Sequence, residues 1–268
     1  MARHHWEQLP PGVREAIANH TGSIDRVEHA TAGSVGDFAA ALTTADGGVF
    51  CKGARADTDR VGFLRNEIRV NRHLPADVAP RLRWHLEKNG WLIAAFDRAT
   101  GRSADLRPGS PDLPVVAGAL TRMAAALTPC PPITIQPAAA RWGGLLDPVL
   151  LRGDTLLHTD MTHHNFIVDG DRVQVVDWSM PCRGPAWLDA ARMLVRLIRA
   201  GHTPAQAEIW AAQLPTWADI SPDAVDAFAA ALAKLARRLR DDNTGAPHLA
   251  EMADASRAWL RHRRHGPR

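Results

Sequence analysis

Long apolar runs are missing from this chain of 268 residues. No stretch approaches the roughly 18 apolar residues that a membrane-crossing helix needs. Residues 1–10 carry Arg3, Glu7 and a proline where a signal peptide would have its apolar core. We therefore expect a cytoplasmic protein with no membrane partner. The 46% hydrophobic and 23% charged residues are close to the average of globular proteins, which excludes disordered, collagen-like and coiled-coil chains.

Cysteine is also scarce. Cys51, Cys130 and Cys182 are odd in number, far apart and never spaced as CxxC. This pattern excludes a disulfide framework and a zinc finger. We interpret the three residues as small buried side chains or free thiols.

A strong charge imbalance is absent from most of the chain. Lysine and arginine exceed the acids by 32 − 29 = 3, and residues 257–268 alone hold five arginines with no acid. Without that terminus the chain is slightly acidic, so no basic groove for nucleic acid is indicated. We expect the basic terminus to be a solvated helix end, with contact to an anionic surface as the alternative.

Short β-prone runs separated by turn signals dominate residues 1–98. The last two runs flank Asn89-Gly90, which is a strong signal for a β-hairpin. Apolar residues at helical spacing predict one helix at the start and another that ends before Pro75. The expected strands are 24–30, 38–43, 49–52, 82–87 and 91–96, and the first helix is 11–20.

Residues 99–268 have a helical texture, with one strand-like exception. The exception is 165–168 and 173–177 around Asp169-Gly170, again a hairpin signal. The expected helices are 113–127, 186–200, 204–214 and 222–240. The sequence thus predicts an α+β protein with a β-rich lobe at 1–98 and a helical lobe at 99–268, joined near 97–105.

Polar residues gather at both ends of this second hairpin. His158-Thr159-Asp160-Met161-Thr162-His163-His164-Asn165 precedes it, and Asp177 follows it 17 residues after Asp160. Carboxylate and amide oxygens suit Mg²⁺. Phosphoryl transfer needs such a metal, a carboxylate for the attacking hydroxyl and a cation for the phosphates. The first lobe can supply that cation.

The run HTDMTHHN followed by VVDW resembles the HxDxxxxN loop and the metal-binding Asp of the aminoglycoside phosphotransferase and choline kinase family, which has the protein-kinase-like fold. Lys52, on the third expected strand after a glycine-containing loop, is similar to the family's phosphate-binding Lys. Glu67, 15 residues later, is similar to its Glu partner. Residues 91–96 resemble the hinge strand that touches the nucleotide base, and 185–189 resemble the segment after the metal Asp.

The resemblance implies a kinase that transfers the γ-phosphoryl of ATP or GTP to a hydroxyl of a small molecule, with Mg²⁺. An aminoglycoside-type antibiotic is the leading acceptor. Asp160 is implied as the catalytic residue that orients or deprotonates the hydroxyl, and His158 as a support of its loop. The other implied roles are Mg²⁺ binding by Asn165 and Asp177, phosphate binding by Lys52 held by Glu67, phosphate cover by Gly33, Ser34 and Gly36, and nucleotide contact by Ala95 and Phe96.

Three positions depart from the family pattern. Thr159 replaces a glycine, and His163 and His164 replace Pro-Gly. Four alternatives stay open. The protein could be a metabolic kinase for a sugar, a choline-like alcohol or a nucleoside-type metabolite, or it could be a nucleotide-binding pseudokinase. Some polar residues could form a transition-metal cluster, and a set of acids could form an amine-binding patch or merely cap helices. The cluster would comprise His158, Asp160, His163 and His164, and the patch would draw on Asp219, Asp223, Asp226, Asp241 and Asp242. The oligomeric state is not indicated.

Overall fold

The computed structural model describes residues 3–31, 36–45, 47–218 and 220–266. The chain divides into two compact units. The first comprises residues 1–102 and 167–180, and the second comprises 103–166 and 181–268. The first division therefore falls inside the segment 97–105 that we expected to join the lobes. In contrast to the predicted boundaries, the 167–180 segment belongs to the first unit.

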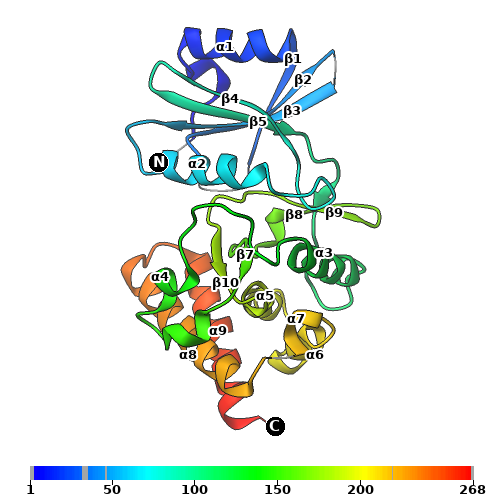
Figure 1. Cartoon of the computed structure of the whole chain (residues 1–268), viewed down its shortest axis with the longest axis vertical. Helices are drawn as coiled ribbons and strands as arrows, with labels where there is room; N and C mark the ends of the chain where they lie inside the picture. Colours follow the sequence, from blue (N-terminus) through cyan, green and yellow to red (C-terminus); the bar gives the residue numbers. More distant parts are fainter. Residues whose placement is uncertain (1–2, 32–35, 46, 219, 267–268) are drawn as a thin grey trace. The chain divides into compact units, whose positions relative to one another are not determined.

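A five-stranded antiparallel sheet of order β1-β2-β3-β5-β4 forms the first unit, as shown in Figure 1. All five predicted strands are confirmed to within a few residues. Their bounds are β1 Ile24–His29, β2 Phe38–Thr44, β3 Gly47–Arg55, β4 Leu82–Lys88 and β5 Trp91–Asp97.

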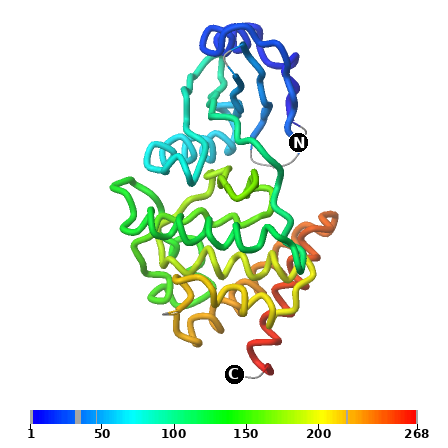
Figure 2. Tube along the Cα trace, turned by 90° about the vertical axis from the view of Figure 1, so that its right-hand side faces the viewer, coloured from blue at the N-terminus to red at the C-terminus, as the bar shows by residue number. Residues whose placement is uncertain are grey.

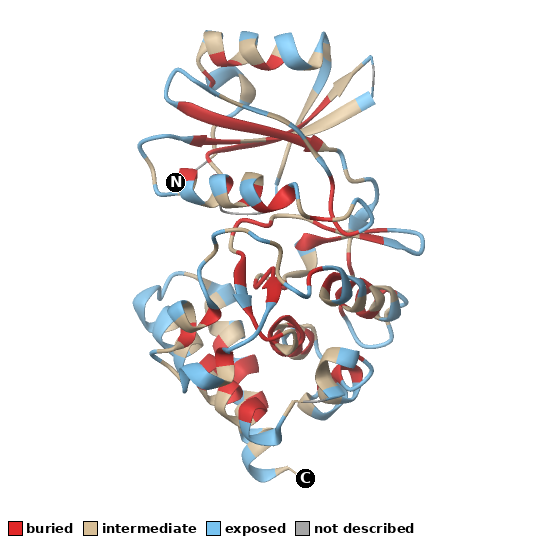
Figure 3. Cartoon of the chain, in the orientation of Figure 1, coloured by how far each residue is buried: buried red, intermediate tan, exposed pale blue. Residues whose placement is uncertain are grey.

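The strand β5 is buried on both faces, as Figure 3 shows. Its alternating side chains enter two apolar clusters. One cluster contains Ile93 and packs against α1 (Pro11–Thr21), and the other contains Ala94 and packs against α2 (Arg60–Asn71). The views in Figure 1 and Figure 2 place α1 and α2 on opposite faces of the sheet. This arrangement assigns every side chain of β3 and β5 to one of two faces.

Both predicted hairpins are present, and left-handed residues form their turns. Asn89 and Gly90 have φ of 49° and 76° between β4 and β5. Gly170 has φ of 61° between β8 (Phe166–Asp169) and β9 (Arg172–Val175). Two successive positive φ values define the turn that matches the twist of antiparallel strands, which is why Asn-Gly predicts it.

The second unit is mainly helical, and its most buried helix is α5. Its helices are α3 Asp112–Ala126, α4 Ala138–Trp142, α5 Trp187–Arg199, α6 Pro204–Ala211, α7 Pro215–Ala218, α8 Pro222–Asp242 and α9 Pro247–His265. Short strands β7 (Thr155–Leu157) and β10 (Cys182–Gly184) pair antiparallel. Further short elements are β6 Arg102–Ser103 and the 3-10 helices Trp6–Gln8, Pro148–Leu151 and His163–Asn165.

The basic terminus is only partly the solvated helix end that we expected. Arg257, Arg261 and Arg264 are exposed on α9, but Trp259 on the same helix is fully buried. Arg263 is ion-paired with Asp226 and Glu208. The apolar and ion-paired side of α9 thus holds this helix against α8, α6 and α5.

Burial of the cysteines agrees with their interpretation as small buried side chains or free thiols. Cys51 and Cys182 are buried free thiols, and Cys130 is half-buried. Burial raises the pKa of the Cys51 thiol to about 12, so it stays protonated. None of the described helices combines the length and apolar character that crossing a membrane requires.

Candidate active site

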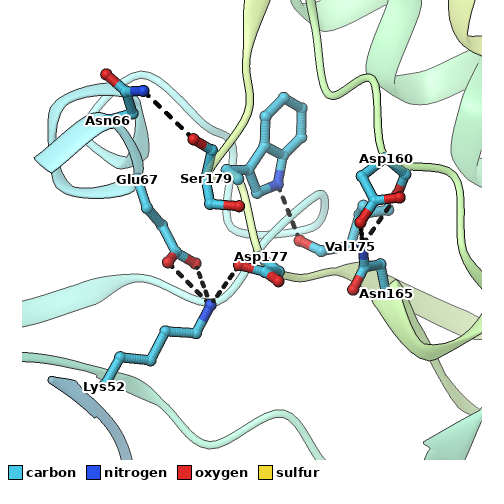
Figure 4. Close-up of polar contacts among 9 residues, drawn as sticks. Lys52, Asn66, Glu67, Asp160, Asn165, Val175, Asp177 and Ser179 are labelled. Carbon is cyan, nitrogen blue, oxygen red and sulfur yellow. Dashed lines mark hydrogen bonds and ion pairs between the residues drawn. The ribbon is translucent and has the colours of Figure 1, made fainter. Parts of the chain in front are cut away.

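Lys52 lies between two carboxylates of the first unit, as Figure 4 shows. Its Nζ donates to both Glu67 oxygens at 2.8 Å and to Asp177 Oδ1 at 3.0 Å. The strand β3 supplies Lys52, α2 supplies Glu67, and the segment after β9 supplies Asp177. The contact between Lys52 and Glu67 that the resemblance implied is therefore present, and Asp177 joins it.

This ion-paired cluster is largely shielded from water. The side chains of Lys52, Glu67 and Asp177 are only 18%, 6% and 19% exposed. Burial lowers the pKa of Lys52, but the charges of Asp177 and Glu67 and their hydrogen bonds outweigh it and raise the pKa to about 12. The Lys52 ammonium is therefore a permanent cation at a fixed position.

Phe96 shares this face of the sheet, whereas Ala95 does not. Lys52 Nζ lies 5.9 Å from the centre of the Phe96 ring. Ala95 belongs to the apolar cluster on the α1 face, and β5 pairs with β3 and β4 on its two edges. The structure thus brings Phe96 to the lysine and leaves Ala95 on the opposite face.

Gly36 belongs to a pocket that also contains Lys52, Glu67, Asp177 and Ser179. A Cβ atom at Gly36 would lie 3.1 Å from the carbonyl oxygen of Phe38, so a larger residue here would crowd the neighbouring backbone. The other two glycine-loop candidates, Gly33 and Ser34, lie outside the described residues.

Asp160 is held in the second unit by contacts to both carboxylate oxygens. Arg196 Nη2 donates to Oδ1 at 3.2 Å, and Asn165 Nδ2 donates to Oδ2 at 3.3 Å. Asn165 Nδ2 also donates to the Asp160 carbonyl at 2.9 Å, as drawn in Figure 4. His158 is fully buried, and its Nδ1 accepts the Asp160 N–H at 3.2 Å. The loop therefore fixes the direction of the Asp160 side chain.

Asp189 anchors the same loop from the first turn of α5. Its two oxygens accept the backbone N–H groups of His158 and Thr159 at 2.9 and 2.8 Å. Burial raises the pKa of Asp189, while the interaction with His158 and these two hydrogen bonds oppose the rise. Asp189 was not among the site candidates, although its segment 185–189 was part of the resemblance. Its role became visible only through contacts that join residues 30 positions apart.

Thr159 occupies a backbone conformation that normally selects glycine. Its φ is 68°, in the left-handed region that is costly for a β-branched residue. The side chain is almost fully buried, and its hydroxyl accepts a hydrogen bond from Arg141. Threonine at this position therefore takes a left-handed conformation and adds a contact to α4.

Arg196 was not among the site residues expected from the sequence. The available signal was the spacing of Asp189, Arg192, Arg196 and Arg199 along α5, because residues three or four apart share one helix face. Nothing in that spacing shows which neighbouring loop the face contacts.

Two of the open alternatives, the transition-metal cluster and the amine-binding patch, can be compared with the structure. The proposed histidine cluster does not bring three metal-ligating atoms together: among the described residues only His5, Glu7 and His29 do so. The rings of His163 and His164 instead contact each other, with their centres 3.8 Å apart and their planes inclined by 38°. For the amine patch, Asp226 is paired with Arg263 and Asp241 with Arg240, Asp223 and Asp242 are exposed, and Asp219 lies outside the described residues.

Comparison with known proteins agrees with the resemblance. Residues 135–222 match the model of the phosphotransferase enzyme family. No curated protein matches the chain in sequence.

Solved structures share the whole fold. A thermostable mutant of aminoglycoside phosphotransferase APH(4)-Ia in its apo form is similar with a TM-score of 0.63 and 18% identity, over 92% of this chain and 98% of that chain. Choline kinase LicA from Streptococcus pneumoniae is similar with a TM-score of 0.63 and 11% identity, over 93% of this chain and 97% of that chain. Residues 135–222 thus match the phosphotransferase family model, and the chain as a whole has the fold of these solved phosphotransferases and kinases.

Proposed function

We propose that this protein is a small-molecule kinase that transfers the γ-phosphoryl group of ATP or GTP to a hydroxyl group. The observation that carries the proposal is the fixed carboxylate of Asp160, which Asn165 and Arg196 hold at both oxygens. A carboxylate in a fixed direction can orient an acceptor hydroxyl and take its proton.

The first unit supplies the proposed nucleotide contacts. Lys52 offers a charged ammonium held by two carboxylates, and this position suits the α- and β-phosphates. Gly36 and the neighbouring Gly33 and Ser34 are proposed to cover the phosphates with backbone N–H groups. Phe96 contributes its ring to the face that carries Lys52. The similar APH(4)-Ia and LicA proteins have been solved with ADP and AMP, respectively, which supports a nucleotide here.

Asn165 and Asp177 fit the proposed Mg²⁺ ligands by the chemistry of their donors. Asn165 uses its NH₂ group on Asp160, and its amide oxygen makes no hydrogen bond to a described residue. Asp177 offers a carboxylate, and oxygen donors of these two kinds suit Mg²⁺. When bound, the ion would neutralise phosphate charge.

Asp160 carries the proposed proton transfer. The acceptor hydroxyl gives its proton to the Asp160 carboxylate as its oxygen forms a bond to the γ-phosphorus. The bond from that phosphorus to the β,γ-bridging oxygen breaks, and ADP or GDP leaves. Asp189 and His158 keep the loop in place during this step.

Two acceptor classes remain as candidates. An aminoglycoside is supported by the fold neighbour solved with hygromycin B. A metabolic alcohol or sugar is the second candidate, and a specific observation favours it. Arg196 contacts Asp160, and two of the four described amine-patch acids, Asp226 and Asp241, are already paired with arginines. A role in antibiotic resistance would follow only from the first class.

The test is Mg²⁺-dependent release of ADP and GDP with aminoglycosides, choline, sugars and sugar acids. Acceptor-stimulated release that Asp160→Asn abolishes is expected. Mg-nucleotide binding without acceptor-dependent release across such a panel would favour a pseudokinase, and release that survives the substitution would contradict the assigned mechanism.

A further inference from the structure

The loop that holds Asp160 faces an arginine-rich side of α5. Arg192 and Arg196 lie four residues apart, and this spacing puts them on one face of the helix. Arg196 reaches the Asp160 carboxylate, and its side chain is only 17% exposed. Arg199, one turn further on, is neutralised by Glu251 at 2.7 Å.

A second helix adds another arginine. Arg141, on α4, donates to the hydroxyl of Thr159, the residue before Asp160. The guanidinium groups of Arg141 and Arg192 lie 5.2 and 5.7 Å from the ring centre of Trp142. Stacking occupies the flat face of a guanidinium group and leaves its N–H donors available at the edge.

Arg192 is the member of this group whose donors are unused. Its Nε is buried with no hydrogen-bond partner, and the side chain makes no hydrogen bond or ion pair with any residue that the structure describes. Burial, followed by the nearby charge of Arg196, lowers the pKa of Arg192 to about 10, and Asp160 limits this fall. The side chain is therefore still a cation at neutral pH, with an unsatisfied donor that costs free energy until an acceptor reaches the group.

The nearby carboxylates do not supply an acceptor for Arg192. Three cations, Arg141, Arg192 and Arg196, share this region with two carboxylates, Asp160 and Asp189. Both oxygens of Asp189 already accept backbone N–H groups, and Asp160 is bonded at both of its oxygens. The region thus retains a positive excess beside the proposed catalytic carboxylate.

We propose that the acceptor is an anion, a hydroxylated small molecule whose carboxylate or phosphate group binds the unpaired guanidinium of Arg192 while its hydroxyl meets Asp160. This inference rests on the proposed kinase function and narrows its substrate class. The planar fork of an arginine matches carboxylate and phosphate oxygens. An aminoglycoside or choline would bring like charge to the same group, which disfavours both.

Matched acceptor pairs test the proposal on the wild-type enzyme. The pairs are gluconate against glucose, glycerate against glycerol, and glucose 6-phosphate against glucose, with choline and hygromycin B as cationic acceptors. The anionic member should give a kcat/KM at least about tenfold higher, a modest value for one charge-assisted contact. Equal or better use of the neutral or cationic compounds would overturn the proposal.

Binding separates this proposal from the kinase function itself. Calorimetric titration of the nucleotide-free wild-type protein should show binding of gluconate or glucose 6-phosphate and no binding of choline, whether or not phosphate is transferred. Anion binding without any transfer would count against the kinase function and support the anion site. Transfer to choline or hygromycin B would support the kinase function and count against the anion site.

Arg192→Gln provides the residue test, with Arg192→Lys and Arg14→Gln as its controls. Arg192→Gln should raise KM for the anionic acceptor at least about tenfold while KM for Mg-ATP is unchanged, and Arg192→Lys should retain part of the preference. Arg14 also has a buried Nε without a partner in the described chain, but it lies on α1 of the first unit, so its substitution should leave the preference intact.

Salt dependence supplies a measurement that needs no variant. Raising ionic strength from about 0.05 to 0.5 M should weaken binding of the anionic acceptor and leave that of glucose unchanged, because salt screens only the charged contact. A preference that survives Arg192→Gln, or one that is indifferent to salt, would overturn the assignment.

Discussion

The Asp189 carboxylate accepts the backbone N–H of Thr159 at 2.8 Å, and Thr159 holds the left-handed conformation that turns the chain into Asp160. A residue on α5 thereby stabilises a backbone geometry that is unfavourable for threonine. The position of the proposed catalytic carboxylate depends on this pair.

Substitutions at Thr159 should reverse the usual order of glycine and alanine. Both Thr159→Gly and Thr159→Ala lose the hydroxyl that Arg141 contacts, but only glycine accepts a φ of 68° without strain. The glycine variant should have a free energy of unfolding about 1 kcal/mol higher than the alanine variant. Urea denaturation of the two proteins measures this difference.

Thr162 in the same loop is the matched control. Its φ is −80°, so the free energy of unfolding of Thr162→Ala should be about 0.5–1 kcal/mol higher than that of Thr162→Gly. The same order at both positions would show that Thr159 is not strained.

Asp189→Asn should weaken both stability and turnover. An amide offers one acceptor oxygen to two buried backbone N–H groups and places its own NH₂ against the other one. We expect a loss of about 2 kcal/mol in the free energy of unfolding and a lower kcat. Asp171→Asn, in the exposed β8–β9 turn, should change neither. An unaltered melting temperature in Asp189→Asn would exclude the anchoring role.

Removal of the Lys52 charge should destabilise the first unit. Lys52→Met leaves the carboxylates of Glu67 and Asp177 without their cation in a shielded position, which should cost about 3 kcal/mol of unfolding free energy. The double variant Lys52→Met/Glu67→Met should recover at least half of that loss, because it removes a charge that has become unpaired. Nucleotide use should stay defective in both proteins.

Calorimetric unfolding and KM for Mg-ATP check these two effects separately. A double variant that is no more stable than Lys52→Met would contradict the ion-pair account. A normal KM and kcat in Lys52→Met would remove the lysine from the nucleotide site.

Asp37 should stabilise the folded protein at neutral pH, and this stabilisation should be lost in acid. Burial opposes ionisation of Asp37, but the backbone N–H of Arg55 and the guanidinium of Arg60 outweigh it and lower the pKa below the ordinary 3.8. A carboxyl group whose pKa is lower in the folded than in the unfolded state stabilises the folded protein at any pH above its unfolded-state pKa. This contribution disappears as the pH falls through the folded-state pKa.

Comparison with Asp37→Asn isolates this contribution. The wild-type protein should be the more stable one at pH 7 and should lose that advantage progressively below about pH 4. Thermal unfolding from pH 7 to pH 3 provides the measurement. An advantage that is constant over this range would show that ionisation of Asp37 does not contribute.

Much of the fold and part of the site follow from local signals in the sequence. The Asn89-Gly90 turn fixes a hairpin because only certain residues adopt its φ values. The contact between Lys52 and Glu67 was predictable from the family resemblance, which pairs a strand lysine with a glutamate of the following helix. The strand runs of the first unit were equally clear, since each is bounded by turn residues.

Other features depend on contacts that no local pattern encodes. The buried side of α9 was not predicted, because the exposed arginines of the basic terminus mask the apolar side that buries Trp259. The Arg192 and Arg196 face could be placed on α5 from spacing, but its position beside Asp160 depends on how α5 packs against the loop. The strain at Thr159 likewise appears only once the backbone is known, since threonine itself does not indicate a positive φ.

The most direct test of the central claim is a single-turnover transfer of labelled γ-phosphate by the wild-type protein and by Asp160→Asn, with the best acceptor from the panel. The account predicts a transfer rate at least about 100-fold lower in the variant, because the proton acceptor is lost. The Kd for Mg-ATP should be unchanged, because Lys52 and its contacts are not altered. Equal transfer rates at equal nucleotide affinity would contradict the assignment of Asp160 and with it the proposed mechanism.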